Sequence, residues 1–166
     1  MDVKYINPFM SSIRNVFQTM LSLDVTFGKP GIKTDAHASH DVSGVIGLSG
    51  DVDGVVVSGP RLSAVRIAST FAGVNLSEVD DDFPDAIGGL ANMISGNAKK
   101  DLGGLKVFIS PPSVVVGASH QIKSTKIIPR LVIPRSTLAG SFVVEVGMRV
   151  VNRPAELLVA TAAEAI

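Results

Sequence analysis

The sequence contains no cysteine and no tryptophan, and only 5% of its 166 residues are aromatic. Without cysteine there can be neither a disulfide framework nor a thiolate metal site. Long apolar runs are also missing, because none reaches the roughly 20 residues that a membrane-spanning helix needs. The first residues lack the basic and then apolar order of a secretion signal. We therefore expect a cytoplasmic protein that does not enter a membrane.

Neither sign of charge is in excess, since 15 Lys and Arg residues balance 15 Asp and Glu residues. Nothing at the level of the whole chain therefore attracts nucleic acid or an anionic membrane. Basic residues do occur at Lys123, Lys126, Arg130 and Arg135. They are spread among apolar strand-like segments with few aromatic side chains on which bases could stack. Nucleic-acid binding thus ranks third, behind the two functions described below.

Apolar residues make up 46% of the chain, which is enough for one globular domain with a sizeable core. Apolar positions at helical spacing predict helices over about 7–23, 62–73 and 83–101. Pro129 and Pro134 interrupt one strand-like run, which predicts an edge or bulged strand there. A helix, a hairpin, two helices and then several strands predict an α+β fold with helices on one face of the sheet. The strand-like runs are 25–27, 42–48, 54–57, 106–110, 113–117, 127–134 and 142–151.

The helix predicted over 83–101 has clear start signals and a clear apolar stripe. Asp81 and Asp82 are candidate N-caps, and Pro84 suits the first turn because an N–H there would be unpaired anyway. At about 100° per residue, six apolar residues fall on one face, which we expect to be buried. These residues are Ile87, Leu90, Ala91, Ile94, Ala98 and Leu102.

The opposite face of this helix is polar and rich in glycine, and it carries Asp85, Gly89, Asn92, Gly96 and Lys99. Each interior glycine costs about 1 kcal/mol relative to alanine, and asparagine is a mediocre helix former. Such a face needs a reason other than helix stability. We interpret it as a surface that something outside the helix approaches closely.

Several separated motifs follow one another along the chain. They are Ile6-Asn7-Pro8-Phe9, Val16-Phe17-x-Thr19-Met20-Leu21, Gly44-Val45-Ile46-Gly47-Leu48-Ser49-Gly50, Asp85-x3-Gly89-x2-Asn92-x3-Gly96-Asn97-Ala98-Lys99 and Pro112-Ser113-Val114-Val115-Val116-Gly117. Together they resemble the CheX branch of the CheC/CheX/FliY phosphatases, over about residues 3–151. The family's helix motif has a catalytic glutamate where this chain has Gly89.

The resemblance implies a CheC-like fold for residues 1–151, with an antiparallel or mixed sheet and long amphipathic helices packed on one face. Residues 152–166 are expected to form a tail or a short helix. The resemblance also implies a homodimer that pairs through the sheet, which exposed edge strands make physically reasonable.

The activity that the resemblance implies is hydrolysis of the phospho-aspartate of a CheY-type response regulator, in chemotaxis or two-component signalling. The regulator supplies its own Mg²⁺ and lysine, so we expect the protein to carry no cofactor of its own. Asn92 would be the catalytic residue that orients the attacking water, and Asp85, Gly89, Gly96 and Lys99 would lie at the partner-binding surface. Asp85 cannot replace the glutamate, because seven residues of helix rise about 10 Å.

A second function remains open because of Gly89. A relative without the glutamate could bind a receiver domain, or only itself, without hydrolysis. Losing a charge pair that docking buries costs several kcal/mol, enough to reduce turnover by orders of magnitude. If the resemblance holds in detail, Gly89→Glu is expected to raise activity.

His37, His40 and Asp41 are close together in the sequence, as metal ligands often are. No helical spacing and no further ligand support a metal site here, so we interpret them as solvated loop residues and expect no metal.

Overall fold

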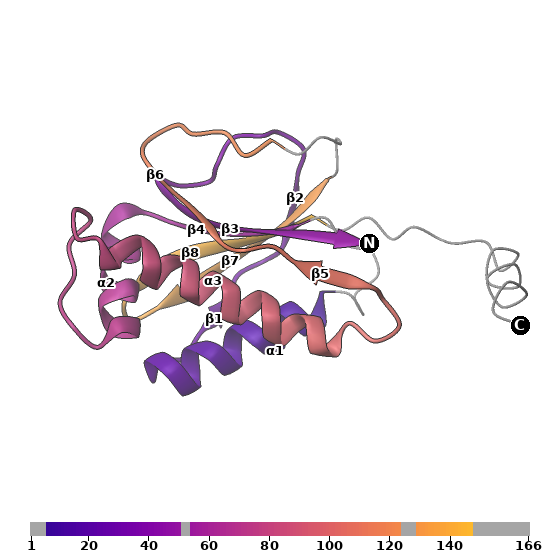
Figure 1. Cartoon of the computed structure of the whole chain (residues 1–166), viewed down its shortest axis with the longest axis horizontal. Helices are drawn as coiled ribbons and strands as arrows, with labels where there is room; N and C mark the ends of the chain where they lie inside the picture. The colour runs from indigo at the N-terminus through magenta and orange to yellow at the C-terminus, as the bar shows by residue number, and fades with distance from the viewer. Residues whose placement is uncertain (1–5, 51–53, 124–128, 148–166) are drawn as a thin grey trace, which may run out of the picture.

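The computed structural model describes residues 6–50, 54–123 and 129–147, and within them one antiparallel sheet carries three helices on a single face (Figure 1). The strand order is β1-β7-β8-β4-β3-β5, with β2 also paired to β7 and β6 also paired to β3. This α+β arrangement confirms the predicted fold class. The strands are β1 (Thr26–Phe27), β2 (Gly31–Lys33), β3 (Val42–Gly50), β4 (Gly54–Gly59), β5 (Val107–Ile109), β6 (Ser113–Val116), β7 (Arg130–Thr137) and β8 (Gly140–Gly147).

The three helices are α1 (Asn7–Val16), α2 (Arg61–Ala72) and α3 (Asp82–Asp101). The first helix is shorter than predicted, because the π-helical turn η2 (Phe17–Leu21) follows it and Ser22 then adopts a left-handed conformation. The ring of Phe17 stacks on Phe142 of β8 at 4.7 Å between centroids, which fixes this end of α1 on the sheet. In the described part of the chain, no helix has both the length and the hydropathy needed to cross a membrane.

The apolar stripe of α3 is buried as predicted, since all six of its members are less than 10% exposed. Asp81 lies at the N-cap position as predicted, but it is itself in a helical conformation and its side chain makes no capping hydrogen bond. The carboxylate of Asp80 accepts bonds from the backbone N–H and the hydroxyl of Ser77 instead, and these bonds lower the pKa of Asp80. Asp82 and Asp85 lie in the first turn, where the helix dipole favours negative charge.

Of the two predicted alternatives for the strand that contains Pro134, the edge strand is wrong, because β7 pairs with β8 on one side and with β1 and β2 on the other. Proline is tolerated there since it lies in the gap between β1 and β2, where its missing N–H leaves no ladder bond unmade. Its carbonyl accepts a 2.8 Å bond from the Gly28 N–H. A Cβ at Gly28 would lie 2.9 Å from the Pro134 Cβ, so this close approach requires glycine.

The sheet face away from the helices is covered by two segments, residues 34–41 and 117–123, which we call the strap (Figure 1). The two segments pair with each other through an isolated bridge between His37 and Gln121. With helices on one side and the strap on the other, residues 142–147 of β8 are all buried. The rest of the predicted final strand, 148–151, and the predicted tail, 152–166, lie outside the described residues.

Candidate functional site

Helix α3 presents the predicted site residues on its solvent side. Asp85, Asn92 and Lys99 are exposed, and Gly89 and Gly96 are half-buried. The five residues lie along one face, opposite the buried stripe. The structure therefore brings together on one face the residues that the sequence predicts at the site. We call this face the α3 ridge.

The sheet beneath α3 holds the helix rigidly, because small residues allow the backbones to approach closely. A Cβ at Gly44 of β3 would lie 3.1 Å from the Ala91 Cβ, and one at Gly88 would lie 3.3 Å from the Pro112 ring. Gly88 is buried, so the close approach that its lack of side chain permits comes from the protein's own β5–β6 connection. The Ser12 hydroxyl of α1 donates a 2.7 Å hydrogen bond to the Ile94 carbonyl. Contacts from the sheet and from α1 thus fix the position of the α3 ridge.

Asn92 carries the only side-chain amide among the five ridge residues, and this amide makes no hydrogen bond within the described part of the chain. An amide can both donate and accept, so this side chain can bind a water and a phosphoryl oxygen at the same time. No contact with this side chain among residues 6–50, 54–123 and 129–147 indicates a structural role. Its chemistry is available to a partner.

One turn before Asn92, the ring of Phe71 from α2 stands over Gly89. A Cβ built at Gly89 would lie 3.3 Å from Phe71 Cε1 and 3.6 Å from Cζ. At Gly96, one turn after Asn92, a Cβ would meet nothing within 4 Å. The two glycines therefore differ, since Gly89 adjoins an aromatic ring and Gly96 faces open space. Sequence patterns within one helix could not reveal the Phe71 contact, because it joins two helices.

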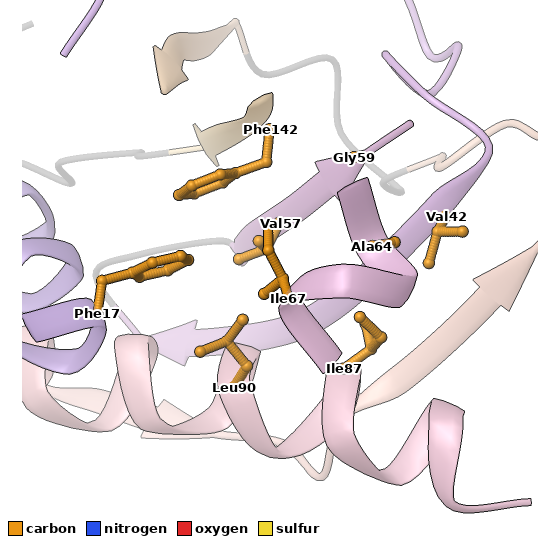
Figure 2. Close-up of a pocket in the computed structure, with 9 residues that line it drawn as sticks. All are labelled: Phe17, Val42, Val57, Gly59, Ala64, Ile67, Ile87, Leu90 and Phe142. Atoms are coloured by element: carbon orange, nitrogen blue, oxygen red, sulfur yellow. The ribbon is translucent and has the colours of Figure 1, made fainter. Parts of the chain in front are cut away.

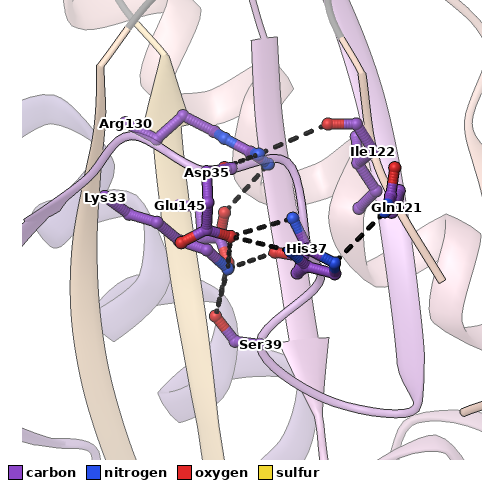
Figure 3. Close-up of polar contacts among 8 residues, drawn as sticks. All are labelled: Lys33, Asp35, His37, Ser39, Gln121, Ile122, Arg130 and Glu145. Carbon is purple, nitrogen blue, oxygen red and sulfur yellow. Dashed lines mark hydrogen bonds and ion pairs between the residues drawn. The ribbon is translucent and has the colours of Figure 1, made fainter. Parts of the chain in front are cut away.

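A second polar cluster lies under the strap, at the fully buried Glu145 of β8 (Figure 3). Arg130 Nη1 lies 3.0 Å from Glu145 Oε2, as an ion pair whose geometry is not that of a hydrogen bond. Lys33 Nζ lies 3.3 Å from Oε1, and the Ser39 hydroxyl donates to the same oxygen at 2.5 Å. Sequence analysis did not single out Glu145. The available signal was one carboxylate within an otherwise apolar strand.

This second cluster holds the strap in place. Arg130 Nη2 donates to the Asp35 carbonyl at 2.8 Å and to the Ile122 carbonyl at 3.3 Å, so one guanidinium binds both strap segments. His120 bridges the Ser43 hydroxyl and the Gly117 carbonyl, each at 2.8 Å. Every one of these groups contacts other groups of the same chain. The arrangement is structural rather than catalytic.

The histidines that suggested a metal do not form a site in the structure. His37 Nδ1 lies 3.6 Å from an Asp35 oxygen, and its Nε2 lies 3.1 Å from the Gln121 amide. Burial lowers the pKa of His40 despite the opposing effect of Asp41 and Glu145. Within the described ranges, no group of three or more His, Cys, Asp or Glu side chains is arranged to hold a metal ion.

Two of the basic residues considered for nucleic-acid binding, Arg130 and Arg135, lie on opposite faces of the sheet. Arg130 is engaged under the strap, while Arg135 is 2% exposed and lies on the helix side of the sheet. The centroid of the Phe27 ring lies 3.9 Å from the guanidinium carbon of Arg135 and 4.8 Å from that of Arg14. Burial first, and the charge of Arg14 second, lower the pKa of Arg135 to about 9. Lys126 lies outside the described residues.

A small apolar cavity of about 20 Å³ lies between α2, α3 and the sheet (Figure 2). Polar side chains that could orient a ligand do not line it, so we regard it as a packing gap in the core. Its lining residues are Phe17, Val42, Val57, Gly59, Ala64, Ile67, Ile87, Leu90 and Phe142.

The fold and the ridge define a class of protein: α+β domains in which a glycine-rich polar helix face lies outside an antiparallel sheet. A family model described as chemotaxis phosphatase CheX matches residues 42–136. The CheY-P phosphatase CheX of Thermotoga maritima is 30% identical over 135 residues, which cover 79% of this chain and 87% of that protein. The chain belongs to the CheX family.

Solved structures support the same assignment. CheX from Desulfovibrio desulfuricans matches with a TM-score of 0.79 and 30% identity, over 88% of this chain and 99% of that one. A chain from the Borrelia burgdorferi complex of CheX, CheY, BeF3 and Mg²⁺ matches with a TM-score of 0.72 and 26% identity, over 87% of this chain and 97% of that one. The predicted CheC-like fold is confirmed.

Proposed function

We propose that this protein hydrolyses the phospho-aspartate of a CheY-type receiver domain in chemotaxis or two-component signalling, with Asn92 orienting the attacking water. The observation that carries the proposal is the exposed Asn92 amide, which is flanked by glycines at positions 89 and 96 and makes no hydrogen bond within the described residues. Family membership supports the reaction, and the Borrelia CheX complex, which contains CheY, supports the partner.

The reaction asks little covalent chemistry of this chain. Water attacks phosphorus in line with the bond to the aspartyl oxygen, the aspartate leaves as a carboxylate, and the phosphate keeps the oxygen of the water. The receiver contributes Mg²⁺ and the leaving group. An amide that accepts from the water and donates to a phosphoryl oxygen contributes position, and misplacement of about 1 Å can cost 100-fold in rate.

The remaining ridge residues would form the surface on which the receiver docks. Asp85 and Lys99 offer one charge of each sign at the two ends of the ridge, and Gly96 leaves space beside Asn92. Because Asp85 lies about two turns from Asn92, it would contribute to docking and not to the chemistry.

A second candidate is a receiver-binding module without hydrolysis. The observation that favours it is Gly89, which leaves no carboxylate one turn before Asn92. In this case the receiver would bind to the same ridge, and its phosphoryl group would decay at its own rate.

Decay of a phosphorylated receiver domain distinguishes the two functions. We expect the wild-type protein to accelerate decay and Asn92→Ala to return it to the rate of the receiver alone. Asn15→Ala is the matched control, since Asn15 is an exposed asparagine on α1, and it should retain the wild-type rate. Decay that is equally slow with wild type and Asn92→Ala, together with binding, would establish the second candidate.

We also propose that the protein forms a homodimer through the sheet. A short strand with an exposed apolar side chain lies at each edge of the sheet. Ile32 in β2 is 77% exposed and Phe108 in β5 is 66% exposed. Exposed edges of this kind favour pairing with another strand. Sedimentation analysis should show a dimer. Loss of the dimer in Ile32→Lys or in Phe108→Lys would identify the edge that forms it. A monomer at all concentrations would refute the proposal.

A further inference from the structure

An aromatic ring of α2 adjoins the position beside Asn92 at which residue 89 would carry a side chain. Phe71 Cε1 lies 3.3 Å from where the Cβ of residue 89 would begin. Phe71 is half-buried, and it packs against both apolar clusters of the core. Part of the ring therefore supports α2 on α3, and part of it reaches the surface next to the α3 ridge.

No charged side chain of the C-terminal half of α2 compensates for the missing carboxylate. Residues 67–77 contain no Asp, Glu, Lys or Arg. The nearest acidic residue after them, Glu78, forms a 2.9 Å ion pair with Arg61 at the start of α2. The surface one turn before Asn92 thus has no carboxylate of its own, and an aromatic ring adjoins the helix backbone there. The nearest acidic residue of the ridge, Asp85, lies a further turn away, so a cation that faced residue 89 directly would have no carboxylate beside it.

We propose that Phe71 determines which receiver this protein accepts: its ring, beside Asn92, selects a receiver that presents an apolar side chain, and not a cation, at this point of the docking surface. This inference rests on the proposed function. It follows from desolvation, because docking removes water from the contact. An apolar pair gains from that loss, whereas a cation loses hydration without a carboxylate in return.

The inference and the family resemblance predict opposite effects for Gly89→Glu. If a cation faced position 89, a carboxylate there would strengthen docking. If an apolar side chain faces it, docking buries the new carboxylate against Phe71 and an apolar surface, so we expect binding to weaken about tenfold. A receiver domain loaded with Mg²⁺ and beryllofluoride is the binding probe. Tighter binding by Gly89→Glu would overturn the inference.

Substitutions at Phe71 test the ring itself. We expect Phe71→Ser to raise KM about tenfold while kcat changes less than twofold, because the contact positions the receiver and does not touch the reacting atoms. Phe71→Leu should restore KM to within about threefold of wild type, since an apolar contact needs no aromatic ring. If Phe71→Leu is as impaired as Phe71→Ser, the ring face binds a cation and the inference is wrong.

Leu62→Ser is the matched control. Leu62 is also an apolar residue of α2, 62% exposed, and nine residues of helix place it about 180° away from Phe71. It should leave KM unchanged. Thermal unfolding of each variant shows whether the fold persists, and Phe71→Leu keeps the test decisive if Phe71→Ser unfolds.

Failure of the inference and failure of the proposed function give different results. If the wild-type protein hydrolyses the phosphorylated receiver but Phe71→Ser leaves KM unchanged, the inference alone fails. If the wild-type protein neither binds the loaded receiver nor accelerates decay, the proposed function fails and the inference fails with it.

Discussion

The α3 ridge and the polar cluster around Glu145 under the strap, here called the Glu145 cluster, differ in one respect. The polar side chain at the centre of the Glu145 cluster has partners within the chain, and that of the ridge is exposed. Glu145 is fully buried and contacts Arg130, Lys33 and Ser39. The side-chain amide of Asn92 is exposed and makes no hydrogen bond within the described residues. Groups of the same chain surround Glu145, whereas none of the described residues bonds to the amide of Asn92.

This difference indicates where stability and function lie. A buried carboxylate is tolerated only when cations and donors compensate its lost hydration, so the Glu145 cluster belongs to the fold. An asparagine between glycines in an exposed helix face contributes nothing comparable to stability, and each glycine lowers it. We therefore expect substitutions under the strap to change stability and substitutions on the ridge to change activity.

The largest expected effect on stability comes from Glu145→Ala. It leaves the partly buried Arg130 and Lys33 beside each other without the buried carboxylate that pairs with both, and removing one partner of a buried pair typically costs about 3–5 kcal/mol. Urea denaturation measures the loss. Glu78→Ala is the control, since its partly exposed pair with Arg61 should contribute about 0–1 kcal/mol. Equal losses for the two variants would contradict the assignment of Glu145 to the fold.

A smaller effect is expected where β3 supports α3. In Gly44→Ala the new methyl group would lie 3.1 Å from the Ala91 Cβ and 3.3 Å from the Ile87 carbonyl oxygen. Overpacking of this kind costs about 1–3 kcal/mol, which thermal and urea unfolding can detect. An unchanged stability would show that β3 and α3 are less closely packed than the structure indicates.

Gly96→Ala tests the ridge, where we expect a substitution to raise stability and to affect activity. The added methyl group meets nothing within 4 Å, so helix propensity should raise stability by about 1 kcal/mol. Phosphatase activity should fall if the receiver needs the space at Gly96. Higher stability with full activity would remove Gly96 from the docking surface.

The smallest effect concerns pH. Burial lowers the pKa of His40, so the unfolded chain binds its proton more readily than the folded protein does. Stability is therefore full above the ordinary histidine pKa of about 6.5 and decreases as the pH falls below it. Melting temperatures between pH 7.5 and 5.5 should decrease for wild type and decrease less for His40→Asn. Equal slopes would assign the pH dependence to other groups.

Much of the fold could be predicted because its signals are local. The periodicity of Ile87, Leu90 and Ile94 sets the buried face of α3, and the same periodicity defines the ridge opposite to it. The hairpin of β3 and β4 followed equally directly from its β-branched residues. The N-cap position of α3 at Asp81 was predicted correctly, but the sequence could not show that its side chain makes no capping hydrogen bond.

The rest depends on contacts between distant segments. The alternation of β8 predicts that Glu145 and Phe142 face opposite ways, but it cannot show that the strap covers Glu145. Pro134 is compatible with an interior strand only because β1 and β2 leave a gap opposite it. The ring of Phe71 over Gly89 likewise follows from the packing of α2 on α3, and no periodicity encodes it.

The most direct test of the account is the decay rate of a phosphorylated receiver domain with Asn92→Ala, measured at protein concentrations that saturate binding. We predict decay at the rate of the receiver alone, with an unfolding free energy equal to that of the wild-type protein. Wild-type decay by Asn92→Ala would show that the exposed amide of the α3 ridge performs no chemistry.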